Sequence, residues 1–256
     1  MFLIIYGSFR GFINQKCQNK ILFAIYNCFF CVYNVVISVI MLISRSVFMK
    51  DMIVKRVPVG SLGTNCYILK DRNSRDAIVI DPGADLTVIQ DALHNCDAVC
   101  RLILLTHGHF DHILAVGDLR GNSVPVGIHE KDAHMLTERD MFSAIIPYDP
   151  RPFAPAEYTF SKEGEYSVAG FDFYVIPTPG HTPGSVCYMF DGMLFTGDTL
   201  FKRSIGRTDL GGDEAQMMRS LRALRNLPGD YDVYPGHDAP TTLEDERECN
   251  PYLKRI

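Results

Sequence analysis

The sequence lacks an excess of positive charge. Its 256 residues carry 25 Lys and Arg side chains against 30 Asp and Glu, which gives a formal net charge of −5. Proteins that bind a phosphate backbone present a basic surface that attracts it. The charge balance therefore argues against DNA or RNA, and we expect no nucleic-acid partner.

The sequence also lacks a disulfide framework. Three of its eight cysteines lie within the first fifty residues, and the other five are irregularly spaced. These five are Cys66, Cys96, Cys100, Cys187 and Cys249. An odd and irregular set is typical of thiols kept in a reducing compartment. We therefore expect the main part of the chain to be cytoplasmic.

Residues 1–50 contain no Asp, Glu or Pro, whereas the remaining 206 residues carry a net charge of −10. The 23 residues from 21 to 43 are interrupted only by Asn27, Asn34 and Ser38. A helix of that length can cross a bilayer core of about 30 Å. We therefore predict an apolar leader over residues 1–50, followed by one α/β domain over residues 51–256.

Three interpretations of this leader stay open. The first is a transmembrane helix over residues 21–43 that anchors the protein. The second is a signal peptide, which the long apolar run and the missing small-residue cleavage site disfavour. The third is translation from Met49 or Met52, with upstream bases read as protein, because half of the first fifty residues are types that AT-rich codons specify. A membrane is a partner only if residues 21–43 are translated and retained.

Short β-branched and aromatic runs alternate with helical patterns along the rest of the chain. Strands are predicted at 53–59, 66–69, 77–81, 101–107, 124–129, 171–178, 185–190, 193–197 and 232–237, and helices at 85–94, 130–139, 214–226 and after Thr241. A proline-rich loop over residues 146–155 separates two β-rich halves. This pattern predicts two sheets packed face to face, with helices on the outside.

The strongest functional signal is the heptapeptide THGHFDH at residues 106–112, directly after an apolar strand. A turn that leaves a strand can point residues i and i+2 at one ion, while i+4 and i+5 diverge toward a second position. One loop can therefore contribute to two metal sites, although catalytic zinc needs about three protein ligands and a water. The remaining ligands must come from elsewhere in the chain.

Three further strand ends supply candidates, each preceded by a glycine: His181 in TPGHTPGS, Asp198 in FTGDTLF and His237 in YPGH. Five His and two Asp are enough for two ions. In this assignment the first ion is held by His107, His109 and His181, the second by Asp111, His112 and His237, and Asp198 bridges both.

These motifs, together with IDPG at 80–83, resemble the metallo-β-lactamase superfamily in their order, and the resemblance covers nearly all of residues 52–256. It implies an αββα four-layer sandwich with the metals in a cleft at one edge of the two sheets. The stretch FKRSIGRTDLGGD at 201–213 is similar to that of short glyoxalase II-like hydrolases. The resemblance therefore implies a dinuclear metal-dependent hydrolase of thioesters of the S-2-hydroxyacylglutathione type.

Differences from other members of the superfamily limit the classes of substrate that we expect. The commonest zinc β-lactamases carry a Cys where Asp198 is found, which argues against antibiotic cleavage. Complete glyoxalase II enzymes add a glutathione-binding helical domain, whereas 19 residues follow His237 here, so a smaller thioester is the alternative substrate. Transfer-RNA nucleases of the superfamily need RNA-binding elements, which the net charge of −10 disfavours.

The expected cofactors are two divalent metal ions, zinc first, with iron and manganese as alternatives because the ligand types suit all three. Water between such ions loses a proton near neutral pH, since coordination lowers its pKa from 15.7 to about 7. The resulting hydroxide attacks the substrate carbonyl. Asp111 is the predicted catalytic residue, because the resemblance places it beside this hydroxide, where it orients the nucleophile and shuttles its proton.

Several neighbouring residues have two interpretations each. Asp81 either accepts a hydrogen bond from a ligand histidine or fills a turn before Pro82. Lys202, Arg203 and Arg207 are candidates to attract an anionic substrate tail, although an ion pair with Asp209 or Asp213 is favoured for Arg207. His94, His129 and His134 do not match ligand positions. The proline-rich loop is either a lid carrying Tyr148 and Phe153 or a plain surface loop.

Two other functions stay open. Persulfide dioxygenases of the same superfamily hold one ferrous ion with two His and one carboxylate, which here would be His107, His181 and Asp198. The third hypothesis is a metal-binding protein without catalytic activity. The sequence gives no prediction of the oligomeric state.

Overall fold

The computed structural model describes residues 51–139 and 149–256. The chain divides into two compact units, Met1–Met49 and Lys50–Ile256, and every described residue belongs to the second. The predicted leader and its apolar segment 21–43 lie outside the described residues. Among the residues that are described, no helix combines the length and the apolar character needed to cross a membrane.

Two six-stranded sheets form the centre of the second unit. The first sheet has the order β1 (Met52–Val59), β2 (Thr64–Asp71), β3 (Asp76–Ile80), β4 (Val99–Leu104), β5 (Val126–His129), β6 (Tyr158–Phe160). The second has the order β14 (Thr241–Thr242), β13 (Asp232–Pro235), β10 (Met193–Gly197), β9 (Val186–Phe190), β8 (Phe171–Pro177), β7 (Gly164–Val168). A small hairpin pairs β11 (Leu200–Phe201) with β12 (Ser204–Ile205).

Strand direction brings many chain segments to one edge of each sheet. In the first sheet β3, β4, β5 and β6 are parallel. In the second sheet β10 is parallel to β13, and β8 has the same direction because both β8 and β10 are antiparallel to β9. The carboxyl ends of parallel strands meet at the same edge, where α/β proteins build their binding sites.

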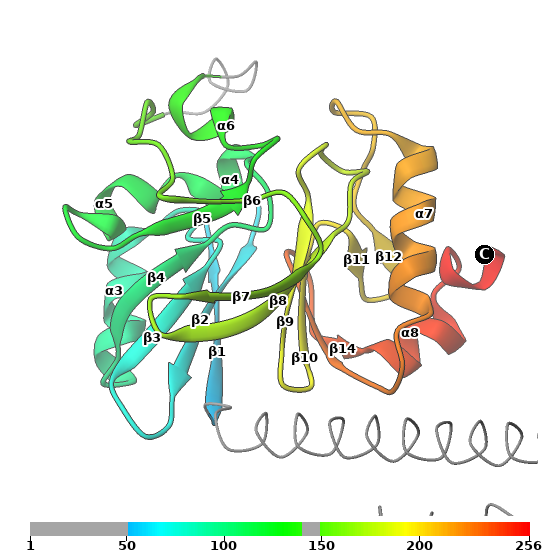
Figure 1. The fold of residues 1–256 in the computed structure, drawn as a ribbon, viewed down its shortest axis with the longest axis horizontal. Helices are drawn as coiled ribbons and strands as arrows, with labels where there is room; N and C mark the ends of the chain where they lie inside the picture. The colour runs from blue at the N-terminus through cyan, green and yellow to red at the C-terminus, as the bar shows by residue number, and fades with distance from the viewer. Residues whose placement is uncertain (1–50, 140–148) are drawn as a thin grey trace, which may run out of the picture. The chain divides into compact units, whose positions relative to one another are not determined.

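Helices cover the outer face of each sheet, as Figure 1 shows. The helices on the side of the first sheet are α3 (Leu86–Asn95), α4 (Phe110–Ile113), α5 (Val116–Arg120) and α6 (His134–Thr137). Those on the side of the second sheet are α7 (Glu214–Arg225), α8 (Leu243–Cys249) and the 3-10 turn η2 (Leu253–Arg255). The order of layers is helix, sheet, sheet, helix, and the predicted αββα sandwich is confirmed.

Apolar side chains alternate along the strands and fill three interfaces. Aromatic rings dominate between the sheets, where Tyr67 of β2 lies 5.2 Å from Phe195 of β10, centroid to centroid, in an edge-to-face arrangement. Outside the first sheet, Ile89 of α3 is buried in a second cluster. Outside the second sheet, Leu221 and Leu224 of α7 are buried in a third.

The predicted elements recur with a few differences. The structure adds the strands β6, β7, β11, β12 and β14, which the sequence analysis did not predict. It also begins α4 within the histidine motif, at Phe110, and places α5 after it. The helix predicted at 130–139 is reduced to His134–Thr137. Leu136 is the buried residue of this helix, and one buried side chain stabilises no more than a single turn. Asp132, which precedes the helix, is turned inward and fully buried. Residues 149–155 form no regular element, as predicted for the proline-rich loop.

The packing of α7 can be tested at Leu221, which is fully buried. We expect Leu221→Ala to lower the free energy of unfolding by about 2–5 kcal/mol, because it leaves a cavity among packed side chains. The neighbouring Arg222 is exposed, so Arg222→Ala should change that free energy by no more than about 0.5 kcal/mol. Urea unfolding followed by circular dichroism measures both. Equal effects of the two variants would contradict the packing of this helix face.

Candidate metal centre

The seven predicted site residues all follow carboxyl ends of strands, and the structure brings them together. Four come after β4, in the order His107, His109, Asp111 and His112, and the other three are His181 after β8, Asp198 after β10 and His237 after β13. They form groups whose nitrogen and oxygen atoms lie within 4.8 Å of one another, close enough to share an ion. Both sheets therefore contribute to one cluster.

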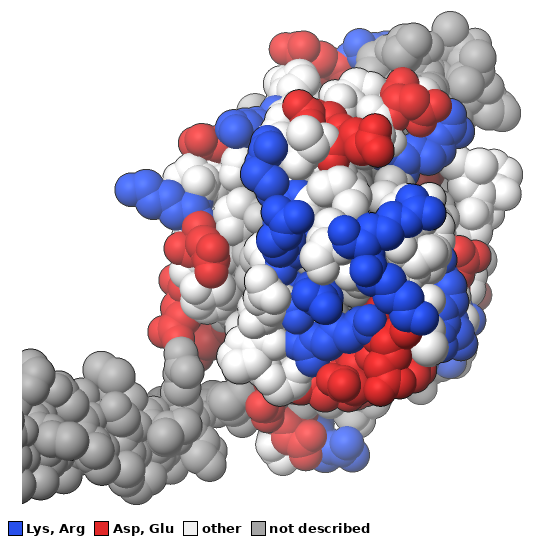
Figure 2. Space-filling view, turned by 90° about the vertical axis from the view of Figure 1, so that its right-hand side faces the viewer, with Lys and Arg blue, Asp and Glu red and all other residues white. Residues whose placement is uncertain are grey.

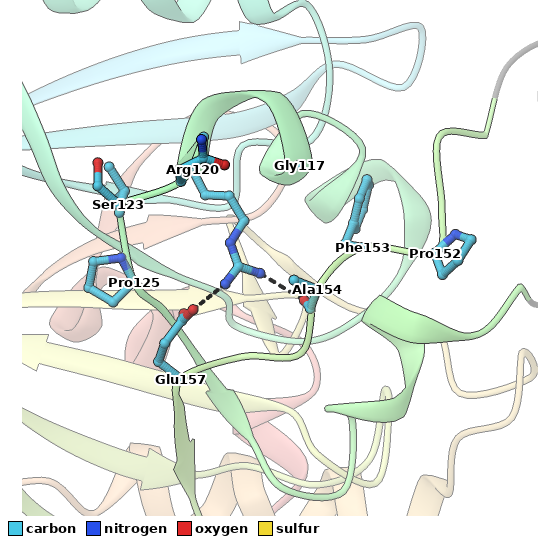
Figure 3. Close-up of a pocket in the computed structure, with 11 residues that line it drawn as sticks. Gly117, Arg120, Ser123, Pro125, Pro152, Phe153, Ala154 and Glu157 are labelled. Atoms are coloured by element: carbon cyan, nitrogen blue, oxygen red, sulfur yellow. Dashed lines mark hydrogen bonds and ion pairs between the residues drawn. The ribbon is translucent and has the colours of Figure 1, made fainter.

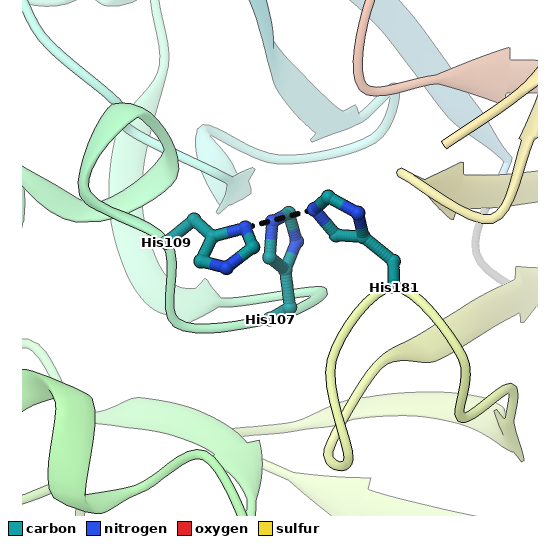
Figure 4. Close-up of side chains that lie close together, drawn as sticks. All are labelled: His107, His109 and His181. Carbon is teal, nitrogen blue, oxygen red and sulfur yellow. Dashed lines mark hydrogen bonds between the residues drawn. The ribbon is translucent and has the colours of Figure 1, made fainter. Parts of the chain in front are cut away.

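The first group consists of three buried imidazoles, His107, His109 and His181. Figure 4 shows their rings meeting between the loop after β4 and the loop after β8. Nδ1 of His109 lies 2.8 Å from Nε2 of His181. The ring of His107 is 4.8 Å from that of His109 and 4.7 Å from that of His181, centroid to centroid. Three converging nitrogens with room for a further ligand are typical of catalytic zinc sites.

The second group consists of Asp111, His112 and His237. Oδ2 of Asp111 lies 3.3 Å from Nε2 of His237 and 3.5 Å from Nε2 of His112. Unlike the first group, it combines imidazoles with a carboxylate and is partly open, since the His237 side chain is 21% exposed. The cluster therefore has contact with solvent at His237.

Asp198 lies between the two groups. Its Oδ1 is 3.4 Å from Nε2 of His112, and its Oδ2 is 3.5 Å from Nε2 of both His181 and His237. One carboxylate thus reaches imidazoles of the first and of the second group. This is the position expected of a residue that bridges two ions.

Three buried atoms of the cluster have no hydrogen-bond partner: Nε2 of His107, Nε2 of His112 and Oδ1 of Asp198. A buried polar atom left unpaired costs about 1–3 kcal/mol, and native proteins contain few of them. All three belong to a third group of potential ligands, His107, His112 and Asp198, which overlaps the other two. Imidazole nitrogen and carboxylate oxygen are ligands that divalent metals accept. The residues therefore fit a metal centre.

The charge state of the first group suits a metal ligand. Burial lowers the pKa of His107, and it lowers that of His109 to about 4; the neighbouring imidazoles add to both shifts. Both rings are therefore neutral at pH 7. Metals bind the neutral form of histidine, because a ring nitrogen must offer its lone pair.

The second group has the opposite balance. Burial by itself lowers the pKa of His112, but the carboxylates of Asp111, Asp198 and Asp81 outweigh it and raise that pKa. Burial likewise opposes ionisation of Asp111 and Asp198, yet the imidazoles beside them hold both carboxyl pKa values below the ordinary range. The carboxylates therefore stay ionised and attract positive charge to this part of the cluster.

Asp81, at the end of β3, supports the cluster from behind. Its carboxylate accepts hydrogen bonds from the backbone N–H and the hydroxyl of Thr106, at 2.8 and 2.7 Å, and lies 2.9 Å from Nδ1 of His112. Occupying Nδ1 in this way turns Nε2 of His112 toward the other ligands. Asp81 also has a φ of 51°, in the left-handed region, directly before Pro82. The hydrogen bond to a ligand histidine is therefore the interpretation that the structure supports.

His181 is oriented by a backbone group. Its Nδ1 donates to the carbonyl of Arg207 at 2.7 Å, which leaves Nε2 for an ion. The Arg207 side chain is exposed and pairs with Asp209 at 2.8 Å, as favoured from the sequence. Arg203 donates to the carbonyl of Asp245 at 2.9 Å. Figure 2 shows Lys and Arg gathered on the side of the molecule that carries α7 and α8.

Glycines let the motif loops approach the ligands. A Cβ on Gly83 would lie 1.6 Å from the carbonyl oxygen of Asp111, and one on Gly236 would lie 2.2 Å from Oδ1 of Asp198. Neither position has room for a side chain. The glycines of IDPG and YPGH are therefore required by close backbone packing around the cluster.

Three residues of β2 support the site and were missed by the sequence analysis. The Thr64 hydroxyl donates to Oδ2 of Asp111 at 2.8 Å. Asn65 and Tyr67 both donate to the carbonyl of Pro235, at 2.9 and 2.7 Å, and so fix the loop that carries His237. Nothing in the TNCY sequence itself distinguishes these residues from those of an ordinary strand.

The three remaining histidines of residues 51–256 lie outside the cluster, as expected. His94 and His134 are exposed. His129 is buried, and its Nδ1 accepts a hydrogen bond from the backbone N–H of Lys131 at 3.2 Å. None of the three is a member of a potential ligand group.

A separate cavity of about 620 Å³ lies beside α5, and none of the seven site residues lines it (Figure 3). Arg120 in its wall pairs with Glu157 and donates to the carbonyl of Ala154 at 2.7 Å, so its charge is already used. Phe153 also lines this cavity and packs on Gly117. Its position does not support the lid interpretation, and Tyr148 lies outside the described residues.

Comparison with protein families agrees with this geometry. Residues 59–237 match the profile of the Metallo-beta-lactamase superfamily. A probable metallo-hydrolase of Streptococcus pyogenes is 37% identical over 204 residues, covering 75% of this chain and 86% of that protein. The hydroxyacylglutathione hydrolase GloC of Haemophilus influenzae is 34% identical over 207 residues, covering 77% of this chain and 96% of that protein.

Solved structures give the same result. BLEG-1, a B3 metallo-beta-lactamase, superposes with a TM-score of 0.74 at 36% identity, covering 78% of this chain and 99% of that one. TTHA1623 in a di-iron-bound form superposes with a TM-score of 0.67 at 34% identity, covering 78% of this chain and 100% of that one. ETHE1 from Myxococcus xanthus superposes with a TM-score of 0.63 at 30% identity, covering 78% of this chain and 84% of that one.

The support from Asp81 can be tested with Asp81→Asn. We expect the free energy of unfolding of the metal-free protein to fall by about 1–3 kcal/mol, because the amide leaves a buried donor without its acceptor. We also expect zinc affinity to fall by about 10–100-fold, because His112 loses its orientation. Urea unfolding and zinc titration measure the two effects.

Asp76→Asn is the matched control for this variant. Asp76 pairs with Arg101 at the surface, at 2.7 Å, and begins β3, whereas Asp81 follows the other end of that strand. We expect at most about 1 kcal/mol of destabilisation and unchanged zinc affinity. Unchanged zinc affinity in Asp81→Asn as well would refute the role assigned to Asp81.

Proposed function

The chain belongs to the metallo-beta-lactamase superfamily, and from this membership and the geometry of the cluster we infer that it is a dinuclear metal-dependent hydrolase of thioesters. Its relatives include metallo-hydrolases. The observation that carries the proposal is the pair of ligand groups with Asp198 between them, 3.4–3.5 Å from imidazoles of both, together with three buried atoms left without hydrogen-bond partners. One ion can be coordinated by only part of the seven side chains, whereas two ions can be coordinated by all of them.

In this proposal each ion has its own ligands. His107, His109 and His181 hold the first ion, Asp111, His112 and His237 hold the second, and Asp198 bridges them. Zinc is the proposed metal, because three converging imidazoles suit it. Iron and manganese are the alternatives, and the di-iron form of TTHA1623 favours iron among them.

Two divalent ions, when bound, lower the pKa of coordinated water to about 7 and polarise a carbonyl oxygen. The chain's own residues supply orientation and proton transfer. Asp111 is partly buried, and its Oδ2, which accepts a hydrogen bond from the Thr64 hydroxyl at 2.8 Å, also faces the cluster, 3.3 Å from Nε2 of His237. We propose that this carboxylate orients the attacking water and takes up its proton. The partly exposed His237 marks the side at which substrate enters.

The proposed substrate is an S-2-hydroxyacylglutathione or a smaller thioester. The likeness to GloC supports the glutathione thioester. Lys202 and Arg203 are exposed in the turn between β11 and β12, shortly after Asp198, and can attract an anionic tail. Nucleic acid is not proposed as a partner, because the domain has a net charge of −10.

The likeness to ETHE1 favours a second candidate function, an iron-dependent persulfide dioxygenase. In that case His107, His181 and Asp198 would hold a single ferrous ion. Nε2 of His181 lies 3.5 Å from Oδ2 of Asp198, so these residues can meet at one ion. The two functions differ in the number of ions bound and in the need for oxygen.

The proposed function is tested by metal analysis and turnover of the full chain. We expect about two metal ions per chain and hydrolysis of S-lactoylglutathione. His109→Ala should lower that hydrolysis by about 100-fold or more, because the first ion loses one of three imidazoles. His94→Ala, a change at an exposed histidine, should leave it unaltered. Elemental analysis and a thioester absorbance assay give the two results.

Other outcomes would identify other functions. One iron per chain, no thioester hydrolysis and oxygen uptake with glutathione persulfide would replace the hydrolase by the dioxygenase. Cleavage of a β-lactam in the absence of thioester hydrolysis would point to an activity like that named for BLEG-1. Full metal loading with no turnover of any of these compounds would leave a metal-binding protein without catalytic activity.

A further inference from the structure

A fully buried carboxylate lies outside the ligand set and receives three hydrogen bonds. Asp132 follows β5 and has no exposed surface. Its Oδ2 accepts from the backbone N–H of Gly108 at 3.1 Å and from the hydroxyl of Thr182 at 2.7 Å. Its Oδ1 accepts from the backbone N–H of Gly184 at 2.8 Å. All three donors belong to segments far from Asp132 in the sequence.

These donors lie in the two loops that carry the first ligand group. Gly108 separates His107 from His109, in the loop after β4 of the first sheet. Thr182 and Gly184 follow His181 in the loop after β8 of the second sheet. A single carboxylate therefore connects the parts of both sheets that must meet for three imidazoles to hold one ion.

The loops pack directly against the segment that carries Asp132. A Cβ on Gly184 would lie 2.4 Å from Oδ1 of Asp132. A Cβ on Gly108 would lie 2.6 Å from the Cβ of Met135, at the start of α6. Both loops thus need glycine in order to reach Asp132, and the two hydrogen bonds to backbone N–H groups depend on this approach.

The hydrogen-bond chain around Asp132 is completely specified. The Thr182 hydroxyl donates to Asp132, so the 2.7 Å contact between Thr182 Oγ1 and Ser185 Oγ must be donated by Ser185. Ser185 in turn accepts from the backbone N–H of Thr182 at 3.0 Å. Asp132 itself is fixed by its own N–H, which donates to the carbonyl of His129 at 3.0 Å.

Besides the 2.8 Å contact between Nδ1 of His109 and Nε2 of His181, two hydrogen bonds join the two loops at their bases. The backbone N–H of Val186 donates to the carbonyl of Thr106 at 2.9 Å, and the Tyr188 hydroxyl donates to the carbonyl of Leu105 at 2.8 Å. Both contacts lie close to the ends of the strands. Asp132 contacts both loops further from the strand ends, at residues next to the ligands themselves.

We propose that Asp132 is a positioning residue of the metal centre, which holds the His107–His109 loop and the His181 loop at the spacing that one ion requires. Functional sites tolerate errors of only about 0.5 Å in the placement of their ligands. Asp132 acts through the backbone N–H groups of Gly108 and Gly184 and through the Thr182 hydroxyl, none of which is a proposed metal ligand. The proposal rests on the metal centre of the proposed function, and it does not depend on the substrate.

The experiment distinguishes binding at the first ligand group from binding at the second by removing one ligand from either group. In a His237→Ala background the first group keeps all three imidazoles, whereas in a His109→Ala background it loses one. Asp132→Asn is added to each in the full chain, and zinc affinity is measured by competition with a chelating dye. We expect zinc binding to weaken by about 10–100-fold in the His237→Ala background and by less than about threefold in the other.

Asp71→Asn is the matched control, because Asp71 is also buried and accepts hydrogen bonds from Asn73 and Ser74 in its own turn. It should alter zinc affinity in neither background. Equal weakening in both backgrounds, or the same weakening with Asp71→Asn, would overturn the proposal and assign Asp132 to general stability. So would unchanged affinity in the His237→Ala background.

A milder variant covers the case in which Asp132→Asn does not fold, as judged by circular dichroism. Thr182→Val removes one of the three donors and leaves the carboxylate in place. We expect it to weaken zinc binding several-fold in the His237→Ala background alone, and no weakening there would count against the proposal. Absence of thioester hydrolysis in the wild-type chain, by contrast, would refute the proposed substrate and leave these zinc results unaffected.

Discussion

Burying five imidazoles and two carboxylates at one edge of two sheets is unfavourable unless something pairs with them, because polar groups lose their hydration there. Hydrogen bonds within the protein satisfy only part of this set, and Nε2 of His107, Nε2 of His112 and Oδ1 of Asp198 are left over. Divalent cations are suited to supply the missing interaction, because imidazole nitrogen and carboxylate oxygen are ligands that they accept. The arrangement of loops around this edge follows from the need to bring these groups to one place.

The scaffold meets that need with a small number of buried anchors. Asp81 fixes Thr106 and His112 of the first sheet, and Asp132 connects the loops of both sheets. Residues of β2 hold Asp111 and the loop before His237. The anchors act on the second ring nitrogen of a ligand, on a ligand carboxylate, or on neighbouring residues of the loops that carry the ligands. Support of this kind is what keeps metal ligands in place.

Much of this could be predicted from the sequence, because the ligand-bearing motifs are local and their strands are strongly apolar. Parallel strands deliver their carboxyl ends to one edge, so the heptapeptide at 106–112 and the later His and Asp residues had to meet if the layered fold was right. Asp132 could not be found in this way. It follows Glu130 and Lys131, both exposed, in what looks like the polar start of a helix, and only the tertiary structure shows that it is turned inward. The role of Thr64 likewise depends on a contact 47 residues away.

The central claim is that one cluster holds two ions bridged by Asp198. X-ray absorption spectroscopy on the metal-loaded chain tests it most directly, because scattering from a second metal reports the distance between the ions. The account predicts a metal–metal distance of about 3.5–4 Å and a coordination shell of nitrogen and oxygen. A spectrum with no second metal at any loading would contradict it.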